Sequence, residues 1–174
     1  MLIAMAGLPG TGKSTLAGRL AAELPAVVLN KDAVRAVLFP PPVLDYSAGQ
    51  DDVSMAAVYS AAGHIHRRNP RQAVILDGRT FSRAYQMRDL LALAASVGEA
   101  PRLIECVCAD EVARGRLESD LARGGHPAGN RTFALYLERK AAAEPIAPPR
   151  LTLDTGATDL EECVRRCLAW LRGG

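Results

Sequence analysis

The stretch GLPGTGKST, from Gly7 to Thr15, decides the fold expected of this chain. It matches the pattern G-x-x-x-x-G-K-[ST], in which successive backbone N–H groups form a nest for phosphate oxygens. An apolar run precedes it at residues 2–6, and an amphipathic pattern follows it at residues 16–24. Such a loop requires a strand before it and a helix after it. The sequence therefore predicts a phosphate-binding loop between the first strand and the first helix.

The parts of this loop have separate chemical tasks. Gly7, Gly10 and Gly12 allow backbone torsions that a side chain would block. The helix that begins near Lys13 points its free N–H groups and the positive end of its dipole at the same anion. Lys13 adds a positive charge for the terminal phosphates, and the Ser14 hydroxyl is placed to ligate Mg²⁺. These features indicate binding of a nucleoside triphosphate.

The composition is that of one ordinary folded domain. The chain has 174 residues, of which 49% are hydrophobic and 23% charged, and its net charge is +2. We expect a single domain over residues 1–174, and the small net charge makes nucleic acid an unlikely partner. No apolar run approaches the ~20 residues of a membrane span, and the N-terminus lacks the features of a signal peptide. We therefore expect a cytoplasmic protein without membrane contact, either a monomer or a homodimer.

The spacing of cysteine and histidine residues favours packing over metal binding. The cysteines are Cys106, Cys108, Cys163 and Cys167. The first pair falls in a predicted strand and the second has helical spacing, so buried small side chains explain them better than a four-thiolate zinc site, which stays possible. His64 and His66 are two residues apart on a predicted helix and do not share a face. A solvated helix end explains them better than a metal site.

Strand and helix patterns alternate along the rest of the chain. Apolar runs predict strands at residues 26–30, 73–77, 102–108 and 150–154, and the first two of these are expected to be buried. Helical patterns cover residues 31–38, 53–68, 82–97, 110–123, 132–144 and 159–172. Asp51 and Asp52 are expected to cap the second of these helices and Ser82 the third. The alternation predicts an α/β fold in which helices cover both faces of a parallel sheet.

Charged side chains follow the second predicted strand. Asp32 and Arg35 are one helical turn apart at the carboxyl end of this strand, where open α/β sheets bind their ligands. Asp32 either takes part in chemistry or satisfies free amides at a helix start, and its position favours chemistry. The loop at residues 39–50 is long, which is typical of a functional loop. Its Tyr46 could stack on a substrate, although an exposed loop tyrosine is the commoner case.

The strand at residues 73–77 brings a second carboxylate, Asp77, to the same edge of the sheet. Downstream of a phosphate-binding loop, such a carboxylate is the expected partner of Mg²⁺ or of its water shell, and the alternative is a simple turn. Arg79, Arg83 and Arg88 come next. Guanidinium groups suit the recognition of phosphate or carboxylate, so we favour substrate binding for Arg79 and Arg83 over a solvated helix face.

Residues 110–144 have the makeup of a closing lid, which we expect at about residues 114–131. A helix, a glycine-flanked loop and a second helix follow one another here. The arginines around the loop are Arg114, Arg116, Arg123 and Arg131. A lid brings guanidinium groups onto the transferring phosphates and excludes water, which prevents wasteful hydrolysis of ATP.

Four segments together resemble the small P-loop kinases of the AAA-family ATP-binding type. The segments are Gly7–Thr15, Asn30–Arg35, Ile75–Phe81 and the Arg114–Arg131 lid. This group includes polynucleotide 5′-kinase, gluconate kinase, chloramphenicol phosphotransferase and the zeta toxins. The segment Gly125–Arg131 is similar to a signature of one bacterial subset. The resemblance spans nearly the whole chain, and it is far more specific for ATP than for the acceptor.

The resemblance implies a P-loop NTPase three-layer sandwich, with a five-stranded parallel sheet and a helical lid, that binds ATP and Mg²⁺. Nucleotide contacts are expected from Gly7, Leu8, Pro9, Gly10, Thr11, Gly12, Lys13, Ser14, Thr15, Arg116 and Thr155. The expected catalytic residues are Lys13, Asp32, Arg116 and Arg123, and the expected metal-side residues are Ser14 and Asp77. Acceptor contacts are expected from Asp32, Arg35, Tyr46, Arg79, Arg83 and Arg131. In this scheme Asp32 is the base that deprotonates the acceptor hydroxyl.

One feature departs from the family pattern. Many relatives carry paired arginines three or four residues apart in the lid helix, whereas here Arg123 lies two full turns beyond Arg116. Either arginine is therefore a candidate for contact with the γ-phosphate.

The leading hypothesis is an ATP-dependent phosphotransferase that moves the γ-phosphate to a hydroxyl of a small molecule. A second hypothesis makes the acceptor a nucleic acid 5′ end, but near-neutral charge and few aromatic residues argue against a strand-binding groove. A third hypothesis is an ATP-binding switch or regulatory ATPase, although such proteins usually carry a partner domain.

Overall fold

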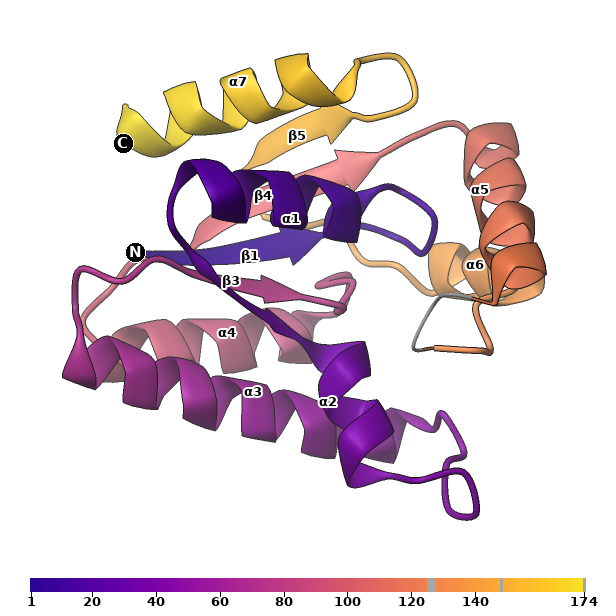
Figure 1. Cartoon of the computed structure of the whole chain (residues 1–174), viewed down its shortest axis with the longest axis horizontal. Coiled ribbons are helices and arrows are strands. Elements are labelled where there is room, and N and C mark those ends of the chain that lie inside the picture. The colour runs from indigo at the N-terminus through magenta and orange to yellow at the C-terminus, as the bar shows by residue number, and fades with distance from the viewer. Residues whose placement is uncertain (125–127, 148, 174) are drawn as a thin grey trace.

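The fold is that of a parallel sheet centred on the strand that precedes the phosphate-binding loop. A computed structural model describes residues 1–124, 128–147 and 149–173. The five-stranded sheet has the order β2-β3-β1-β4-β5 (Figure 1). Its strands are β1 (Leu2–Ala6), β2 (Val27–Asn30), β3 (Val74–Asp77), β4 (Arg102–Val107) and β5 (Leu151–Asp154). Since the chain leaves β1 for one side of the sheet and later returns to the other, the loop after β1 lies at the switch point where such sheets bind ligands.

Helices cover both faces of this sheet (Figure 1). One face carries α1 (Lys13–Glu23) and α7 (Leu160–Arg172), and the other carries α3 (Ala48–Arg68) and α4 (Ala84–Ser96). Beyond the carboxyl ends of the strands lie α5 (Asp110–Arg123) and α6 (Phe133–Ala141), and α2 (Lys31–Leu38) packs against α3. This is the three-layer α/β sandwich that the sequence predicts.

The alternation of side chains along β1 builds two cores. Ile3 and Met5 face the core under α1 and α7, whereas Leu2 and Ala4 face the core under α3 and α4. Three of the four cysteines, Cys106, Cys163 and Cys167, are buried in the first of these cores, and all four are free thiols. Burial raises the pKa of Cys106 to about 12, as expected of a packing residue rather than a reactive one.

Two expectations about burial are wrong. The strand at residues 27–30 pairs only with β3, so it is a half-exposed edge strand and not a buried one. His66 is buried rather than solvated, and its Nε2 lies 3.0 Å from Oε1 of Glu99. In both cases burial depends on which distant segment lies alongside.

Two expected helix caps are also wrong. Helix α3 begins at Ala48, inside the expected loop, because the Ser47 hydroxyl accepts a hydrogen bond from the Gln50 amide. Asp51 and Asp52 are therefore not caps and are free for other contacts. Ser82 is not the cap of α4 either, since its hydroxyl donates to the Thr80 hydroxyl.

Part of the expected lid loop lies outside the residues that the structure describes. Residues 125–127 of that loop, which also belong to the Gly125–Arg131 signature, lie outside the described ranges. The helix before the loop does end at Gly124, which adopts a left-handed conformation with φ of 62°. Among the helices that the structure describes, none combines the length and the apolar character needed to cross a bilayer.

Candidate active site

The phosphate-binding loop makes a close backbone approach to β4. Gly7 has φ of +127°, and a Cβ atom added there would lie 2.2 Å from the carbonyl oxygen of Cys106. Only glycine fits at such a contact. Gly12 is the N-cap of α1 and offers no side-chain cap, so amides of the first turn stay free for an anion.

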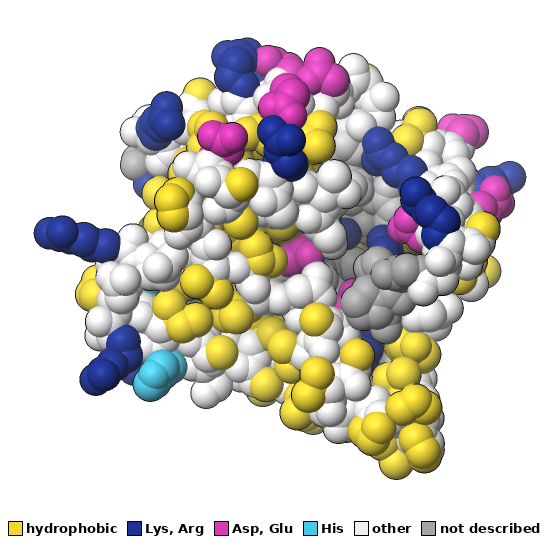
Figure 2. Space-filling model, viewed as in Figure 1, with side chains coloured by type: hydrophobic (Ala, Val, Ile, Leu, Met, Phe, Trp, Pro, Cys, Tyr) yellow, Lys and Arg dark blue, Asp and Glu magenta, His cyan; other side chains and the backbone are white. Residues whose placement is uncertain are grey.

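A cavity of about 910 Å³ opens beside this loop. Its lining comes from the phosphate-binding loop, from α5 and from the segment between β5 and α7. We call it the donor cavity. Its lining residues include Gly10, Gly12, Lys13, Ser14, Thr15, Arg116, Asp120, Arg123, Arg131 and Thr155. Figure 2 shows basic and acidic side chains within a hollow on this side of the molecule. The volume suits a ligand the size of a nucleotide.

Lys13 is buried at the base of the donor cavity. Its Nζ donates a hydrogen bond of 2.7 Å to the carbonyl oxygen of Leu8. Burial lowers the pKa of Lys13 to about 8, against the opposing charges of Asp77 and Asp32. An anion at the loop would offset that cost of burial, so the lysine favours a phosphate ligand.

One carboxylate oxygen of Asp77 has no partner among the residues that the structure describes. Asn30 Nδ2 donates a hydrogen bond of 2.7 Å to Asp77 Oδ2, while Oδ1 is buried without a hydrogen bond among the described residues. An unpartnered carboxylate oxygen near a phosphate site is the type of ligand that Mg²⁺ or its water shell takes. Ser14 is exposed and lines the donor cavity. Ser14 and Asp77, the two expected metal-side residues, therefore offer the type of oxygen ligand that Mg²⁺ binds.

Arg116 joins three parts of the donor cavity. Its guanidinium donates to the carbonyl oxygens of Gly10 and Thr155 and to the Thr155 hydroxyl, at distances of 3.3, 2.8 and 2.9 Å. The Thr155 hydroxyl in turn donates to the carbonyl oxygen of Thr11 at 2.9 Å. Arg116 and Thr155 thus tie α5 and the β5–α7 segment to the phosphate-binding loop.

The other lid arginines share one carboxylate. Arg123 is exposed and lies 3.1 Å from Asp120, and Arg131 lies 3.6 Å from the other oxygen of Asp120. Both arginines line the donor cavity, and Arg131 lines a second cavity as well. Arg114 stacks instead on the Phe133 ring, with its Cζ 4.3 Å from the ring centroid.

A second and smaller cavity, of about 90 Å³, meets the first at Lys13, Ser14 and Arg131. It lies under the start of α2 and against the first turn of α3. Its other polar lining residues are Lys31, Asp32, Arg35, Tyr46, Asp51, Arg79, Thr80, Gln86, Asn130 and Arg139. We call this the acceptor cavity.

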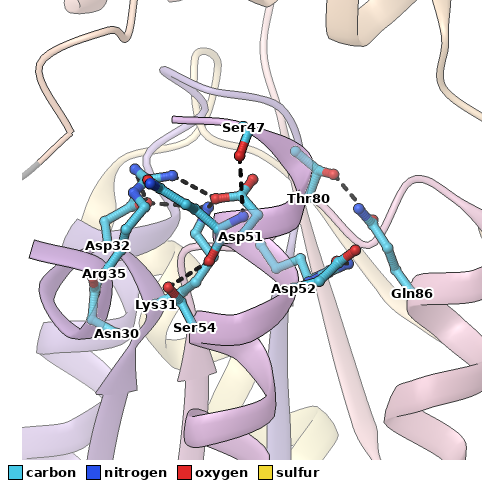
Figure 3. Close-up of polar contacts among 12 residues, drawn as sticks. Asn30, Lys31, Asp32, Arg35, Ser47, Asp51, Asp52, Ser54, Thr80 and Gln86 are labelled. Carbon is cyan, nitrogen blue, oxygen red and sulfur yellow. Dashed lines mark hydrogen bonds and ion pairs between the residues drawn. The ribbon is translucent and has the colours of Figure 1, made fainter. Parts of the chain in front are cut away.

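Asp32 belongs to a buried cluster of charges in the acceptor cavity (Figure 3). Asp32 Oδ1 lies 2.8 Å from Arg35 Nη2 and 3.1 Å from Lys31 Nζ. Both cations also contact Asp51, at 2.5 Å for Arg35 and 2.7 Å for Lys31. Asn30 caps α2 by accepting a hydrogen bond from the Ala33 amide, so Asp32 is not needed as a cap.

Two more of the expected acceptor residues lie in this cavity. The Tyr46 ring lies under the Arg35 guanidinium, with Cζ 4.8 Å from the ring centroid, and its hydroxyl accepts a hydrogen bond from the Gly129 amide. Arg79 is buried, and its Nη2 lies 2.7 Å from Asp52.

Arg83 is not brought to either cavity. Its side chain is exposed, and its guanidinium donates to the carbonyl oxygen of Ala142. The structure therefore leaves Arg83 without a contact to the other expected site residues.

Sequence reasoning missed Lys31, Asp51, Asp120 and Arg139. The sequence pattern favours a helix cap at Asp51, and the other three stand in ordinary helical patterns. Their positions come from packing of segments distant in sequence, for which the chain carries no local signal. Only Lys31 had a hint, since it stands beside Asp32 at the strand end.

Comparison with known proteins shows that the chain has the fold of P-loop kinases. A sequence model of a family described as an AAA domain matches residues 2–142. A candidate kinase from Chloroflexus aurantiacus J-10-fl is 27% identical, with a TM-score of 0.77 over 98% of this chain and 96% of that one. No curated protein matches in sequence.

Two further structures share the fold at lower identity. A gluconokinase from Sinorhizobium meliloti 1021 is 19% identical, with a TM-score of 0.69 over 98% of this chain and 91% of that one. The Mycobacterium tuberculosis APS kinase CysC, in complex with AMPPNP and APS, is 18% identical, with a TM-score of 0.70 over 99% and 98% of the two chains.

Proposed function

The chain belongs to the AAA domain family and has the fold of a small P-loop kinase, and from this we propose that it is an ATP-dependent phosphotransferase whose acceptor is a hydroxyl of a small molecule. One observation carries the proposal. Asp32 lies in the acceptor cavity, which meets the donor cavity at Lys13 and Ser14. A protein that only binds or hydrolyses ATP has no need of a second cavity with a buried carboxylate beside the phosphate-binding loop.

The donor side is assigned to residues of the larger cavity. The backbone from Gly7 to Thr15 would hold the phosphates of ATP, with Thr155 near the rest of the nucleotide. Ser14 and Asp77 would hold Mg²⁺, directly or through water. When bound, the ion neutralises charge on the β- and γ-phosphates. The unpartnered Oδ1 of Asp77 supports this assignment.

In the proposed chemical step, Asp32 acts as the base. Asp32 takes the proton of the acceptor hydroxyl as the hydroxyl oxygen forms a bond to the γ-phosphorus, and the bond from that phosphorus to the β,γ-bridging oxygen breaks to release ADP. Lys13 balances negative charge on the phosphates, and Arg116, Arg123 or Arg131 adds positive charge from the side of α5 and α6. Arg35 positions Asp32 through their 2.8 Å ion pair.

The segment at about residues 114–131 is assigned the role of a lid within a single kinase domain that spans residues 1–174. Closure would bring Arg123 and Arg131 toward the phosphates and exclude water. In the structure, both guanidinium groups have Asp120 as a shared partner. Transfer that depends on ATP also fits the cytoplasmic location expected from the sequence.

The similar structures support the reaction class and leave the acceptor open. Two of them are named as a gluconokinase and an APS kinase, which are phosphotransferases with different acceptors. At 18–19% identity they argue for the fold and not for either substrate.

The test is transfer of labelled phosphate from [γ-³²P]ATP to a panel of hydroxyl compounds that includes sugars, sugar acids, nucleosides, antibiotics and a 5′-hydroxyl oligonucleotide. We expect label in at least one small molecule, together with slow release of free phosphate in its absence. Label in the oligonucleotide alone would indicate a nucleic acid kinase. Rapid release of phosphate that no panel member alters would indicate an ATPase and contradict the proposal.

A further inference from the structure

The acceptor cavity carries an excess of positive charge. Its lining has six cationic side chains and only two carboxylates. The cations are Lys13, Lys31, Arg35, Arg79, Arg131 and Arg139, and the carboxylates are Asp32 and Asp51. A cleft lined by charges of one sign concentrates ligands of the other sign.

Most of these cations have a partner within the protein. Lys31 and Arg35 share Asp32 and Asp51 as one compact cluster. Arg79 pairs with Asp52, just outside the cavity, at 2.7 Å. The three cations Lys31, Arg35 and Arg79 are therefore balanced by three carboxylates, those of Asp32, Asp51 and Asp52.

Two of the remaining three cations are accounted for on the donor side. Lys13 donates to the carbonyl oxygen of Leu8 within the phosphate-binding loop, where the nucleotide phosphates are assigned. Arg131 lies 3.6 Å from Asp120, which stands on the wall of the donor cavity.

Arg139 alone among the six makes no hydrogen bond, ion pair or ring contact with any described residue. Its side chain is half-buried on α6, one helical turn after Leu135, which lines the same cavity. The neighbouring Lys140 and Tyr136 face away from it and both bind Asp110, at 2.6 Å each. Helix α6 thus directs Lys140 to Asp110 and leaves Arg139 in the acceptor cavity, with no counter-ion in the described part of the chain.

Arg79 adds an independent observation. Its side chain is 5% exposed, and its Nε is buried without an acceptor among the described residues. A buried donor without a hydrogen bond costs free energy, so Arg79 has one N–H group whose demand the described residues leave unmet. Arg79 and Arg139 line the same cavity from different elements, the β3–α4 segment and α6.

We propose that Arg139, together with Arg79, binds an anionic group of the acceptor, so that the substrate is a hydroxyl compound that also carries a carboxylate, phosphate or sulfate group. Guanidinium groups present planar pairs of donors that match all three anions. The hydroxyl lies at Asp32, which rests on the proposed function, whereas the anion site at Arg139 can be tested without any transfer.

The first experiment measures binding of inorganic sulfate when the phosphate-binding loop is already filled. Wild-type protein saturated with AMPPNP and Mg²⁺ is titrated with sulfate in a calorimeter, and Arg139→Gln and Arg139→Lys are titrated in the same way. Loss of one charged hydrogen-bonding group predicts at least about a tenfold increase in Kd for Arg139→Gln, and a smaller one for Arg139→Lys. Arg88→Gln is the control, because Arg88 is exposed on α4 and lines neither cavity.

Three results would overturn the anion site. The first is the absence of saturable sulfate binding to the nucleotide-filled wild-type protein. The second is an equal sulfate Kd for wild-type protein and Arg139→Gln, with Arg139→Gln shown to be folded by its thermal unfolding. The third is an equal loss of sulfate affinity in Arg88→Gln, since the effect would then be one of general charge.

The second experiment separates this inference from the proposed function. Phosphate transfer is measured with matched acceptors that differ only in the anion, such as a sugar and its acid, or a nucleoside and its 5′-phosphate. We expect turnover of an anionic member, with KM raised about tenfold or more by Arg139→Gln and the KM for ATP unchanged. Turnover of neutral members alone would refute the anionic acceptor but leave the kinase. Sulfate binding that needs Arg139, without transfer to any acceptor, would refute the kinase but leave the anion site.

Discussion

Asn30 Nδ2 donates a 2.7 Å hydrogen bond to Oδ2 of Asp77, across the ends of two neighbouring strands. The same side chain accepts a hydrogen bond from the Ala33 amide through its Oδ1 and so caps the helix that carries Asp32. One asparagine therefore fixes the start of the acceptor-side helix and orients the carboxylate assigned to the metal. The register of β2 and β3, in which Asn30 pairs with Asp77, makes the contact with Asp77 possible, whereas the cap is local to the start of α2.

The free oxygen of Asp77 leads to a prediction about magnesium. We expect Asp77→Asn to reduce by about tenfold or more the gain in ATP affinity that Mg²⁺ provides, because an amide is a weaker ligand for a hard cation. The measurement is the ratio of the Kd values for an ATP analogue in EDTA and in Mg²⁺. Asp89→Asn, on the exposed side of α4, is the matched control. An unchanged ratio in Asp77→Asn would remove this residue from the metal site.

The buried charge of Lys13 predicts an unusual dependence of stability on pH. Since burial lowers the pKa of Lys13 to about 8, the charged lysine destabilises the nucleotide-free fold. Lys13→Met should therefore raise the free energy of unfolding by about 1 to 3 kcal/mol at pH 7, while ATP binding is lost.

The pH profile gives the sign of this effect. Between pH 8 and about 10.5 the unfolded chain holds more protons at this lysine than the folded chain, so wild-type stability rises relative to the variant. The advantage of Lys13→Met should shrink over that range in urea unfolding experiments. Lys31→Met is the comparison, and it should be destabilising at pH 7, because Lys31 pairs with Asp32 and Asp51. A wild-type protein that is more stable than Lys13→Met at pH 7 would contradict the assigned cause.

A matched pair of glycine substitutions tests the close approach at the phosphate-binding loop. Gly7→Ala places a Cβ atom 2.2 Å from the carbonyl oxygen of Cys106 at a positive φ, and we expect a loss of about 3 kcal/mol or more. Gly18→Ala, in the middle of α1, meets nothing within 4 Å and should raise stability by about 0.5 to 1 kcal/mol. Chemical unfolding measures both. Equal effects of the two substitutions would argue against the backbone contact.

The sequence predicts the parts of this protein that local chemistry determines. The pattern from Gly7 to Thr15 indicates strand, loop and helix together, and Asp77 ends an apolar run at the carboxyl edge of the sheet. Both expectations agree with the structure, as does the ending of α5 at Gly124. In each case a short stretch carries the physical reason for its own conformation.

The remainder depends on contacts between distant segments. The strand order makes β2 an edge strand, and the buried His66 has its partner in Glu99, 33 residues away. Because Ser47 caps α3, this helix begins at Ala48, closer to the N-terminus than expected. Asp51 is therefore inside the helix and can pair with Lys31 and Arg35. Arg139 shows the same limit, because nothing in its own helix distinguishes it from Lys140 until tertiary structure supplies Asp110 to only one of them.

Asp32 is assigned as the group that accepts the proton of the acceptor hydroxyl, and the variant Asp32→Asn is the sharpest test of this role. The two quantities to measure are kcat for phosphate transfer to the acceptor found in the panel and the Kd for ATP with Mg²⁺. Asp51→Asn is the comparison, because Asp51 shares the cations Lys31 and Arg35 and its loss loosens the same cluster. We predict that Asp32→Asn lowers kcat at least about 100-fold, far more than Asp51→Asn does, with the nucleotide Kd within about threefold of wild type. Transfer by Asp32→Asn at a rate close to that of the wild-type protein would show that Asp32 is not the base.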